Sequence, residues 1–295
     1  MIAGPTAVGK TKATIQLAQS FQSEILSADS RQIYKELNIG TAKPSEQELN
    51  AVPHHFINHI SIHDPFDAGQ FENEAIALLD DLFIKHQVVF VTGGTGLYIQ
   101  ALLEGLDQFP YIPDHIRQKW EDSYVQKGIG FLQESLKILD PTYFNTVDRS
   151  NHRRLLRALM VCDVSGQPFS SFLNQERPSR NFIPICILLV QDRSVLYERI
   201  NERIDHMIKQ GLIDEARSLY PHRSEKALQT VGYQELFDHF KGKMSLTEAI
   251  EKIKIHSRRY AKRQLTWFRN QGAFEEVEAD GIDGLEEIVR KRMGD

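Results

Sequence analysis

Short apolar segments alternate with longer amphipathic segments over the first hundred residues. Residues 24–28 and 88–92 are β-rich runs, whereas residues 11–21, 71–86 and 97–103 have the composition and apolar spacing of helices. Strands that alternate with helices in this way are typical of a parallel sheet covered by helices. The pattern therefore predicts an α/β core.

The apolar pattern changes in the middle of the chain. Strand-like runs disappear from about residue 110 to 184, and helical patterns follow one another at 114–126, 131–139 and 151–164. An apolar β-rich run returns at 183–190, and two long helical patterns follow it. We interpret the strand-free stretch as a helical insertion.

The expected organisation has three parts: the first part of the core at 1–110, a helical insertion domain at 111–182, and a return to the core with C-terminal helices at 183–295. The chain has 295 residues, of which 41% are hydrophobic and 25% charged, as is usual for globular proteins. The length is sufficient for one core domain with an insertion.

The composition also limits the compartment and the partners. No apolar run approaches the ~20 residues that cross a bilayer, and no apolar stretch opens the chain. Cys162 and Cys186 lack a metal-ligand spacing and are expected to be ordinary buried thiols. We expect a cytoplasmic protein with no membrane partner, and nothing requires more than a monomer. The net charge of −5 leaves nucleic acid possible, because a local basic face can bind phosphates.

The strongest chemical signal is at the N-terminus, where Gly4, Gly9, Lys10 and Thr11 match the pattern G-x-x-x-x-G-K-[ST]. Such glycines let backbone N–H groups surround phosphate oxygens, and the helix that follows directs its positive end at them. Lys10 is expected to neutralise the outer phosphate, and the hydroxyl of Thr11 to ligate Mg²⁺. The predicted diphosphate-binding residues are Gly4, Pro5, Thr6, Ala7, Val8, Gly9, Lys10 and Thr11. The core should therefore be a P-loop-type parallel sheet.

Two features separate this loop from that of an ATP- or GTP-hydrolysing enzyme. Such enzymes usually hold the metal with an acid at the end of a strand, whereas the run at 88–92 ends in Thr92 and Gly93. The sequence also lacks an Asn-Lys-x-Asp motif for guanine. The loop therefore indicates diphosphate binding more than nucleotide hydrolysis. Only three residues precede Gly4, so its strand is either very short or cut by a start downstream of the natural one; we expect the second.

Two further segments follow predicted strands. Asp29 comes directly after the run at 24–28, and Thr95 lies in the Gly-Gly-Thr-Gly segment after the run at 88–92. Because ligands of an open parallel sheet bind beyond the carboxyl ends of its strands, both residues should face the phosphate loop. Asp29 can be a metal ligand, a general base or simply the N-cap of the next segment. Its position alone does not choose among these roles.

Several motifs, taken in order, resemble the bacterial tRNA dimethylallyltransferase family. They are G-P-T-A-x-G-K-T at 4–11, D-S-x-Q-I-Y at 29–34, I-G-T-A-K-P at 39–44, P-H-H at 53–55, G-G-T-G-L-Y at 93–98 and the basic stretch at 258–269. The resemblance covers nearly the whole chain. The family's usual Tyr-Ser before the helix at Phe71 is Ala68-Gly69 here, which we expect to be a tolerated variation.

The resemblance implies transfer of a dimethylallyl group from dimethylallyl diphosphate to N6 of adenosine 37, in tRNAs that read codons beginning with U, with release of diphosphate. It implies that the loop holds the prenyl diphosphate rather than ATP, and that Asp29 and Thr95 are catalytic. The residues it implies at the tRNA are Asp29, Ser30, Arg31, Gln32, Thr95, Arg117, Arg153, Arg154, Leu155, Leu156 and Arg157. An adenine in a stacked loop must be extruded to reach such a site.

Two basic regions fit an RNA partner. On a helix Arg153 and Arg157 share a face with Arg154 beside them, while the neighbouring leucines can pack inward; without the resemblance a solvated face would be the simpler interpretation. In the second region, residues 258–269, five cations are interleaved with Tyr260 and Trp267. Its role stays open, as do those of three arginines of the preceding long helix, Arg193, Arg199 and Arg203.

His55, His59 and His63 recur every four residues, as zinc ligands on a helix do. Their surroundings look extended, however, and a strand would place successive histidines about 13 Å apart, too far for one metal. We expect His54 and His55 to be structural.

Two alternatives to the transferase remain open. A P-loop small-molecule kinase would use the same loop for ATP, but it leaves the helical insertion and its arginines without a role. A non-catalytic RNA-binding module could retain an inherited loop, although the intact Lys10, Thr11 and Asp29 argue against it.

Overall fold

The computed structural model describes residues 1–173, 179–271 and 274–294. The chain divides into two compact units, one formed by Met1–Leu103 with Arg180–Asp295 and the other by Glu104–Ser179. The second unit begins and ends a few residues before the predicted bounds of 111 and 182. Each unit has its own core and is described by itself.

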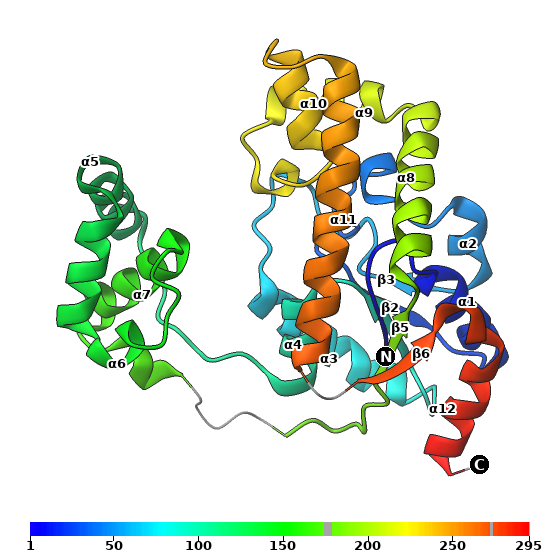
Figure 1. Cartoon of the computed structure of the whole chain (residues 1–295). Helices are drawn as coiled ribbons and strands as arrows, with labels where there is room; N and C mark the ends of the chain where they lie inside the picture. Colours follow the sequence, from blue (N-terminus) through cyan, green and yellow to red (C-terminus); the bar gives the residue numbers. More distant parts are fainter. Residues whose placement is uncertain (174–178, 272–273, 295) are drawn as a thin grey trace. The chain divides into compact units, whose positions relative to one another are not determined.

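A parallel six-stranded sheet forms the centre of the first unit (Figure 1). Its strands lie in the order β3 (His54–His55), β2 (Ile25–Ala28), β4 (Phe90–Gly93), β1 (Ile2–Ala3), β5 (Ile187–Val190) and β6 (Glu275–Glu278). Every residue of β1, β2 and β5 is buried, as expected for strands covered on both faces. The predicted P-loop-type α/β core is confirmed.

The strand before the phosphate loop has only two residues, yet it occupies the middle of the sheet. Ile2 of β1 is in register with Thr92 of β4 on one side and with Ile187 of β5 on the other. The backbone is therefore held by two neighbours up to Ala3, one residue before the loop begins. Because β1 is paired on both sides, the phosphate loop begins at a fixed position in the middle of the sheet.

Two edge strands escaped the sequence prediction, because neither has an apolar pattern. β3 consists of His54 and His55 only, and β6 has the sequence Glu-Glu-Val-Glu. Both lie at the ends of the strand order, where one side is unpaired and polar side chains reach water. The structural role expected for His54 and His55 is confirmed by their place in β3.

The helices of the first unit surround the sheet (Figure 1). They are α1 (Lys10–Ser20), α2 (Glu46–Ala51), α3 (Ala68–Phe83), α4 (Gly96–Glu104), α8 (Arg193–Gln210), α9 (Leu212–Leu219), α10 (Tyr233–Phe240), α11 (Leu246–Asn270) and α12 (Leu285–Met293). Helix α3 begins one turn before the predicted start at residue 71. The side chain of Asp67 accepts hydrogen bonds from the N–H groups of Gly69 and Gln70 and forms a capping box there.

Helices α8 and α11 run alongside each other (Figure 1). Lys254 of α11 forms a 2.7 Å ion pair with Asp205 of α8, and Arg258 donates a 2.6 Å hydrogen bond to Asn201. Helices α9 and α10 pack beside them. These four helices, α8 to α11, place residues from the C-terminal part of the chain next to the sheet.

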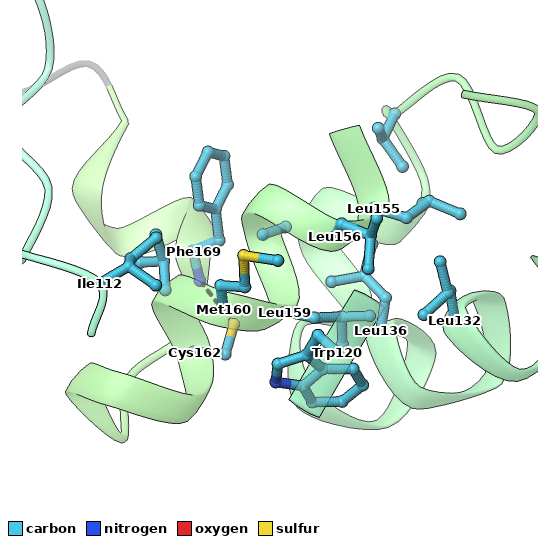
Figure 2. Packing of buried hydrophobic residues seen from close by; sticks show 13 residues of the cluster. Ile112, Trp120, Leu132, Leu136, Leu155, Leu156, Leu159, Met160, Cys162 and Phe169 are labelled. Atoms are coloured by element: carbon cyan, nitrogen blue, oxygen red, sulfur yellow. Dashed lines mark hydrogen bonds between the residues drawn. The ribbon is translucent and has the colours of Figure 1, made fainter. Parts of the chain in front are cut away.

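The second unit is a small helical bundle of α5 (Asp114–Leu139), α6 (Pro141–Phe144) and α7 (His152–Ser165). Gly128, with φ of 73°, interrupts α5 and separates the two helices predicted at 114–126 and 131–139. Figure 2 shows its core, in which Trp120 of α5 and Leu159 of α7 belong to one buried cluster. The helical insertion predicted from the loss of strand signal is present.

Candidate functional site

Three loops that follow neighbouring strands meet at one edge of the sheet. The strands β2, β4 and β1 are adjacent, and their carboxyl ends lead into Asp29, Gly94 and Gly4 respectively. Asp29, Gly94 and Lys10 all line one cavity of about 1000 Å³ in the first unit. The prediction that Asp29 lies close to the phosphate loop is confirmed, because strand order places them two positions apart at the same edge.

The phosphate loop has the backbone that its sequence demands. Gly4 has φ of 155°, and a Cβ there would lie 2.8 Å from the carbonyl oxygen of Leu189 in β5. Gly9 has φ of 105° and ends the loop where α1 begins. Ala7 has φ of 65°, an unusual value for a residue with a Cβ. These turns place the N-terminus of α1 at the cavity wall, where anions are favoured.

Lys10 is held inside this loop. Its ammonium group donates hydrogen bonds to the carbonyl oxygens of Gly4, at 2.9 Å, and Pro5, at 2.8 Å. Burial lowers the pKa of Lys10 to about 8; the charge of Asp29 opposes that shift and the charge of Arg203 adds to it. The cavity therefore contains two cations and one carboxylate that interact electrostatically.

Arg203 is a site residue to which the sequence assigned no role. It comes from α8 and lines the same cavity as Lys10 and Asp29. Burial lowers the pKa of its guanidinium, and Asp29 acts in the opposite direction. Of its neighbours, Arg199 also lines the cavity and lies 3.4 Å from Asp280, whereas Arg193 stacks over the ring of Tyr197. Only tertiary packing distinguishes Arg203 from the other two.

Asp29 caps the segment that follows it, which is one of the three roles left open by the sequence. Its Oδ1 accepts hydrogen bonds from the N–H groups of Arg31, at 2.8 Å, and Gln32, at 3.3 Å, as a capping residue would. The same carboxylate borders the cavity beside Lys10. The two bonds to Oδ1 fix the side chain, so its other oxygen has a defined direction.

Thr95 stabilises the segment after Asp29 through hydrogen bonds to Ser30. Its hydroxyl oxygen accepts a 2.9 Å hydrogen bond from the N–H of Ser30 and donates one of 3.2 Å to the Ser30 hydroxyl. The cavity wall at the end of β4 is formed by Thr92, Gly93 and Gly94 instead. In this structure Thr95 thus positions the residue next to Asp29, and a direct catalytic role stays a prediction.

The side chains of Arg31 and Gln32 tether two other parts of the cavity wall. Arg31 donates to the carbonyl oxygens of Lys226 and Ala227, at 3.2 and 3.1 Å. Gln32 donates through Nε2 to the carbonyl oxygens of Thr41 and Ala42, at 3.2 and 3.1 Å. Residues 29–32 therefore connect the sheet edge to the segments at 39–44 and 226–232.

The segment at 39–44 is fixed from its other side by Glu215 of α9. Glu215 accepts hydrogen bonds from the N–H groups of Asn38, Ile39 and Gly40, and from the hydroxyl of Tyr233 at 2.7 Å. A Cβ on Gly40 would lie 2.6 Å from the Tyr233 ring. The glycine of this motif is required by the close approach of α10.

Gln264 of α11 is a second residue that sequence reasoning missed. Its buried side chain accepts a 2.9 Å hydrogen bond from the N–H of Thr6 and donates one of 2.9 Å to the carbonyl oxygen of Gly94. A Cβ on Gly94 would lie 2.2 Å from Nε2 of Gln264, and one on Gly96 would lie 2.4 Å from the Trp267 ring. The C-terminal basic stretch therefore contains residues that pack directly on the phosphate loop and on the loop that follows β4.

The arginines expected to contact tRNA lie on the surface of the helical unit. Arg117, Arg153, Arg154 and Arg157 are exposed, and Arg157 lies over the ring of Phe109. Their RNA contacts stay predictions. Leu155 and Leu156, which the resemblance also placed at the tRNA, are buried in the core of that unit (Figure 2), and their contact with tRNA stays a prediction as well. These leucines hold α7 in place and leave its arginines outside.

The three regularly spaced histidines each contact a different acid. His55 pairs with Glu24 at 2.7 Å, His59 with Glu74 at 2.8 Å, and His63 with Glu225 at 3.2 Å. Among the described residues, no group of three or more His, Cys, Asp or Glu side chains could hold a metal ion. The oxygen ligands available to a Mg²⁺ ion at the cavity wall include the Thr11 hydroxyl and the Asp29 carboxylate.

The sequence matches the family model described as IPP transferase over residues 32–271. A tRNA dimethylallyltransferase of Christiangramia forsetii is 53% identical over 279 residues, 95% of this chain and 92% of that protein. One of Flavobacterium johnsoniae is 48% identical over 274 residues, 91% of this chain and 89% of that protein. These alignments extend across nearly the whole sequence.

Solved structures of similar fold agree with the sequence relatives. The tRNA isopentenylpyrophosphate transferase of Bacillus halodurans has a TM-score of 0.74 and 33% identity, covering 99% of this chain and 95% of its own. A eukaryotic dimethylallyltransferase acting on tRNA has a TM-score of 0.78 and 27% identity, covering 94% of this chain and 73% of its own.

Within the described part of the chain, no helix is long and apolar enough to cross a bilayer.

Proposed function

This chain belongs to the IPP transferase family, and from that membership we propose that it transfers a dimethylallyl group from dimethylallyl diphosphate to N6 of adenosine 37 in tRNA, releasing diphosphate. One observation carries the proposal. The phosphate loop with Lys10 and the strand-end carboxylate of Asp29 line the same cavity of about 1000 Å³. The cavity thus offers cations for a leaving diphosphate and, beside them, a carboxylate for an attacking amine.

The cations of the cavity would stabilise the charge that develops as the C1–O bond of the prenyl diphosphate breaks. Lys10, Arg203 and the N-terminus of α1 are the groups available for it. Lys10 now rests on the carbonyl oxygens of Gly4 and Pro5, and it can exchange them for phosphate oxygens. Because positive charge spreads over the allyl group, the bond can loosen early, and diphosphate stabilisation supplies much of the rate.

The carboxylate of Asp29 would act on the nucleophile. The lone pair of adenine N6 forms a bond to C1 of the dimethylallyl group while the C1–O bond breaks, and the displaced N6 proton passes to Asp29. The fixed Oδ1, which accepts from Arg31 and Gln32, leaves Oδ2 to receive this proton. Thr95 would contribute by holding Ser30, and with it the Asp29 backbone, in place.

Mg²⁺ is part of the proposal because the residues at the loop suit it. Mg²⁺ is usually bound by one or two protein oxygens together with substrate phosphates, and the two lining residues Thr11 and Asp29 have oxygen-bearing side chains. Thr11 would hold the ion. When bound, Mg²⁺ supplies additional positive charge to the leaving diphosphate.

The tRNA would be held outside the cavity while one base enters it. Extruding adenosine 37 from its stack costs a few kcal/mol, and phosphate contacts by Arg117, Arg153, Arg154 and Arg157 would offset that cost. Selection of tRNAs that read codons beginning with U, a monomeric state and a cytoplasmic location belong to this proposal as well.

A small-molecule kinase is not favoured. The relatives named above are transferases of a prenyl group to tRNA by name, and β4 ends in Thr92 and Gly93 without the acid that holds metal in P-loop hydrolases. A kinase would also leave the exposed arginines of α7 without a function.

The decisive experiment incubates the protein with labelled dimethylallyl diphosphate, Mg²⁺ and unmodified tRNA in the absence of ATP. We expect label in the tRNA at adenosine 37, located by nuclease digestion and mass spectrometry. Parallel reactions with a tRNA in which A37 is replaced by guanosine should incorporate none. Failure of the folded protein to label any unmodified tRNA would overturn the proposal.

A further inference from the structure

A small recess next to the large cavity is rich in cations. It has a volume of about 340 Å³ and lies at the end of the four-helix group of α8 to α11. Its wall includes Arg223, which precedes α10, Lys241, which follows it, and Lys252 and His256 of α11. The charged side chains of the wall are the cations of Arg223, Lys241 and Lys252 and the carboxylates of Glu235 and Asp238.

The two acids of this wall are already engaged. Glu235 is buried, accepts a 2.8 Å hydrogen bond from the N–H of Gly232, and contacts Nδ1 of His256 at 2.5 Å. Asp238 lies 3.0 Å from Lys243 and 4.0 Å from Lys241. The wall of the recess therefore carries three Lys or Arg side chains against two carboxylates, and the carboxylate of Glu235 is buried. The positive charge that remains favours an anionic group.

The recess adjoins the proposed adenosine site. Gln229 and Gln234 line both the recess and the large cavity, and a 2.8 Å hydrogen bond from Gln234 to Gln229 joins them into one wall. Gln229 also donates to the carbonyl oxygen of Arg223 at 2.8 Å. The chain between Arg223 and Gln229 is hydrogen-bonded to residues 29–32, because Arg31 donates to the carbonyl oxygens of Lys226 and Ala227.

A nucleic acid satisfies both the charge and the position. When one base is extruded into the large cavity, its flanking nucleotides stay outside and their phosphates lie along the rim. We propose that Arg223, Lys241 and Lys252 bind backbone phosphates of the RNA next to the reacting nucleotide. This site deepens the proposed function and rests on it, since it presupposes that RNA occupies the large cavity.

The test compares two variants with the same loss of charge. The site variant combines Arg223→Gln, Lys241→Gln and Lys252→Gln. The control combines Lys85→Gln, Lys291→Gln and Arg292→Gln, three cations that line neither cavity. The dissociation constant of unmodified tRNA is measured over a series of KCl concentrations, together with steady-state kinetics for both substrates.

We expect the site variant to bind tRNA about tenfold or more weakly at low salt, and its slope of log Kd against log salt to fall by about 2 relative to the control. The KM for dimethylallyl diphosphate should be unchanged. Lys241→Arg with Lys252→Arg should retain wild-type affinity, because charge rather than shape binds phosphate here.

Equal affinity and slope in the site and control variants would overturn the inference while leaving the transferase function intact. Binding of inorganic phosphate that is lost in the site variant without any change in tRNA slope would identify a free-anion site, and would overturn it too. A wild-type protein that neither binds nor modifies tRNA would overturn the proposed function and this inference with it.

Discussion

The backbone N–H of Thr6 donates a 2.9 Å hydrogen bond to Oε1 of Gln264, although 258 positions separate the two residues in the sequence. The same side chain donates through Nε2 to the carbonyl oxygen of Gly94. One amide of α11 thus joins the phosphate loop to the loop that follows β4. Since neither loop is regular structure, their mutual position depends on such side-chain bonds.

Gln264→Met should separate this role from simple space filling. Methionine has a similar volume but leaves the N–H of Thr6 and the carbonyl of Gly94 without a partner, which costs about 1–3 kcal/mol of unfolding free energy for a buried group. We expect kcat/KM for dimethylallyl diphosphate to fall about tenfold or more, measured by steady-state label transfer.

Two further substitutions sharpen this test. Gln264→Glu can still accept a hydrogen bond from the N–H of Thr6, but it places an oxygen against the carbonyl oxygen of Gly94. Expressed as free energies, its loss in kcat/KM should exceed its loss in unfolding free energy. Thr266→Val, which removes a hydrogen bond to the Lys262 carbonyl on the same helix, serves as the control. Wild-type kinetics in Gln264→Met would show that the bridge does not position the loops.

The titration of Lys10 should limit substrate binding at alkaline pH. Burial lowers its pKa to about 8 in the ligand-free enzyme, so the ammonium loses its proton as pH rises through that value. Because kcat/KM reports the free enzyme, log kcat/KM for dimethylallyl diphosphate should decline above pH 8. In contrast, kcat should stay flat there, since bound diphosphate favours the charged form. A kcat/KM that holds constant to pH 10 would contradict this assignment.

Arg203 should act on both the diphosphate and the titration of Lys10. Arg203→Gln removes a cation from the cavity, and we expect kcat/KM for dimethylallyl diphosphate to fall by about 10²-fold, with tRNA affinity nearly unchanged. The positive charge of Arg203 also lowers the pKa of Lys10, so the alkaline decline of kcat/KM should move to higher pH in the variant. Arg199→Gln is the comparison, and an equal effect there would argue against a specific role for Arg203.

The helical unit should be destabilised by truncating its core without loss of the diphosphate site. Leu159 is fully buried among the side chains of α5 and α7, and Leu159→Ala should cost about 2–5 kcal/mol in urea unfolding. Val125 of α5 is 81% exposed, and Val125→Ala should stay within about 0.5 kcal/mol. Binding of dimethylallyl diphosphate, measured by calorimetry, should match wild type in both, because its cavity belongs to the other unit.

The sequence by itself determined the features that are continuous and local. The phosphate loop is one octapeptide whose glycines and lysine have fixed offsets, and the buried strands at 25–28, 90–93 and 187–190 are apolar runs. The helical unit was visible as a stretch without strand signal, and the break of α5 at Gly128 as a glycine between two helical patterns. Each needs only neighbouring residues to be recognised.

Only the tertiary structure decided which distant residues complete the site. Nothing in the spacing of Arg193, Arg199 and Arg203 marks the last as the cavity residue whose charge acts on Lys10, and Gln264 is an ordinary polar residue within a basic helix. The strand β6 pairs with β5 through backbone hydrogen bonds, and its polar sequence does not predict this pairing. Strand order and helix packing bring these groups together, and both depend on contacts between segments far apart in the chain. That is the physical reason why the loop and Asp29 could be recognised from the sequence, whereas Arg203 and Gln264 could not.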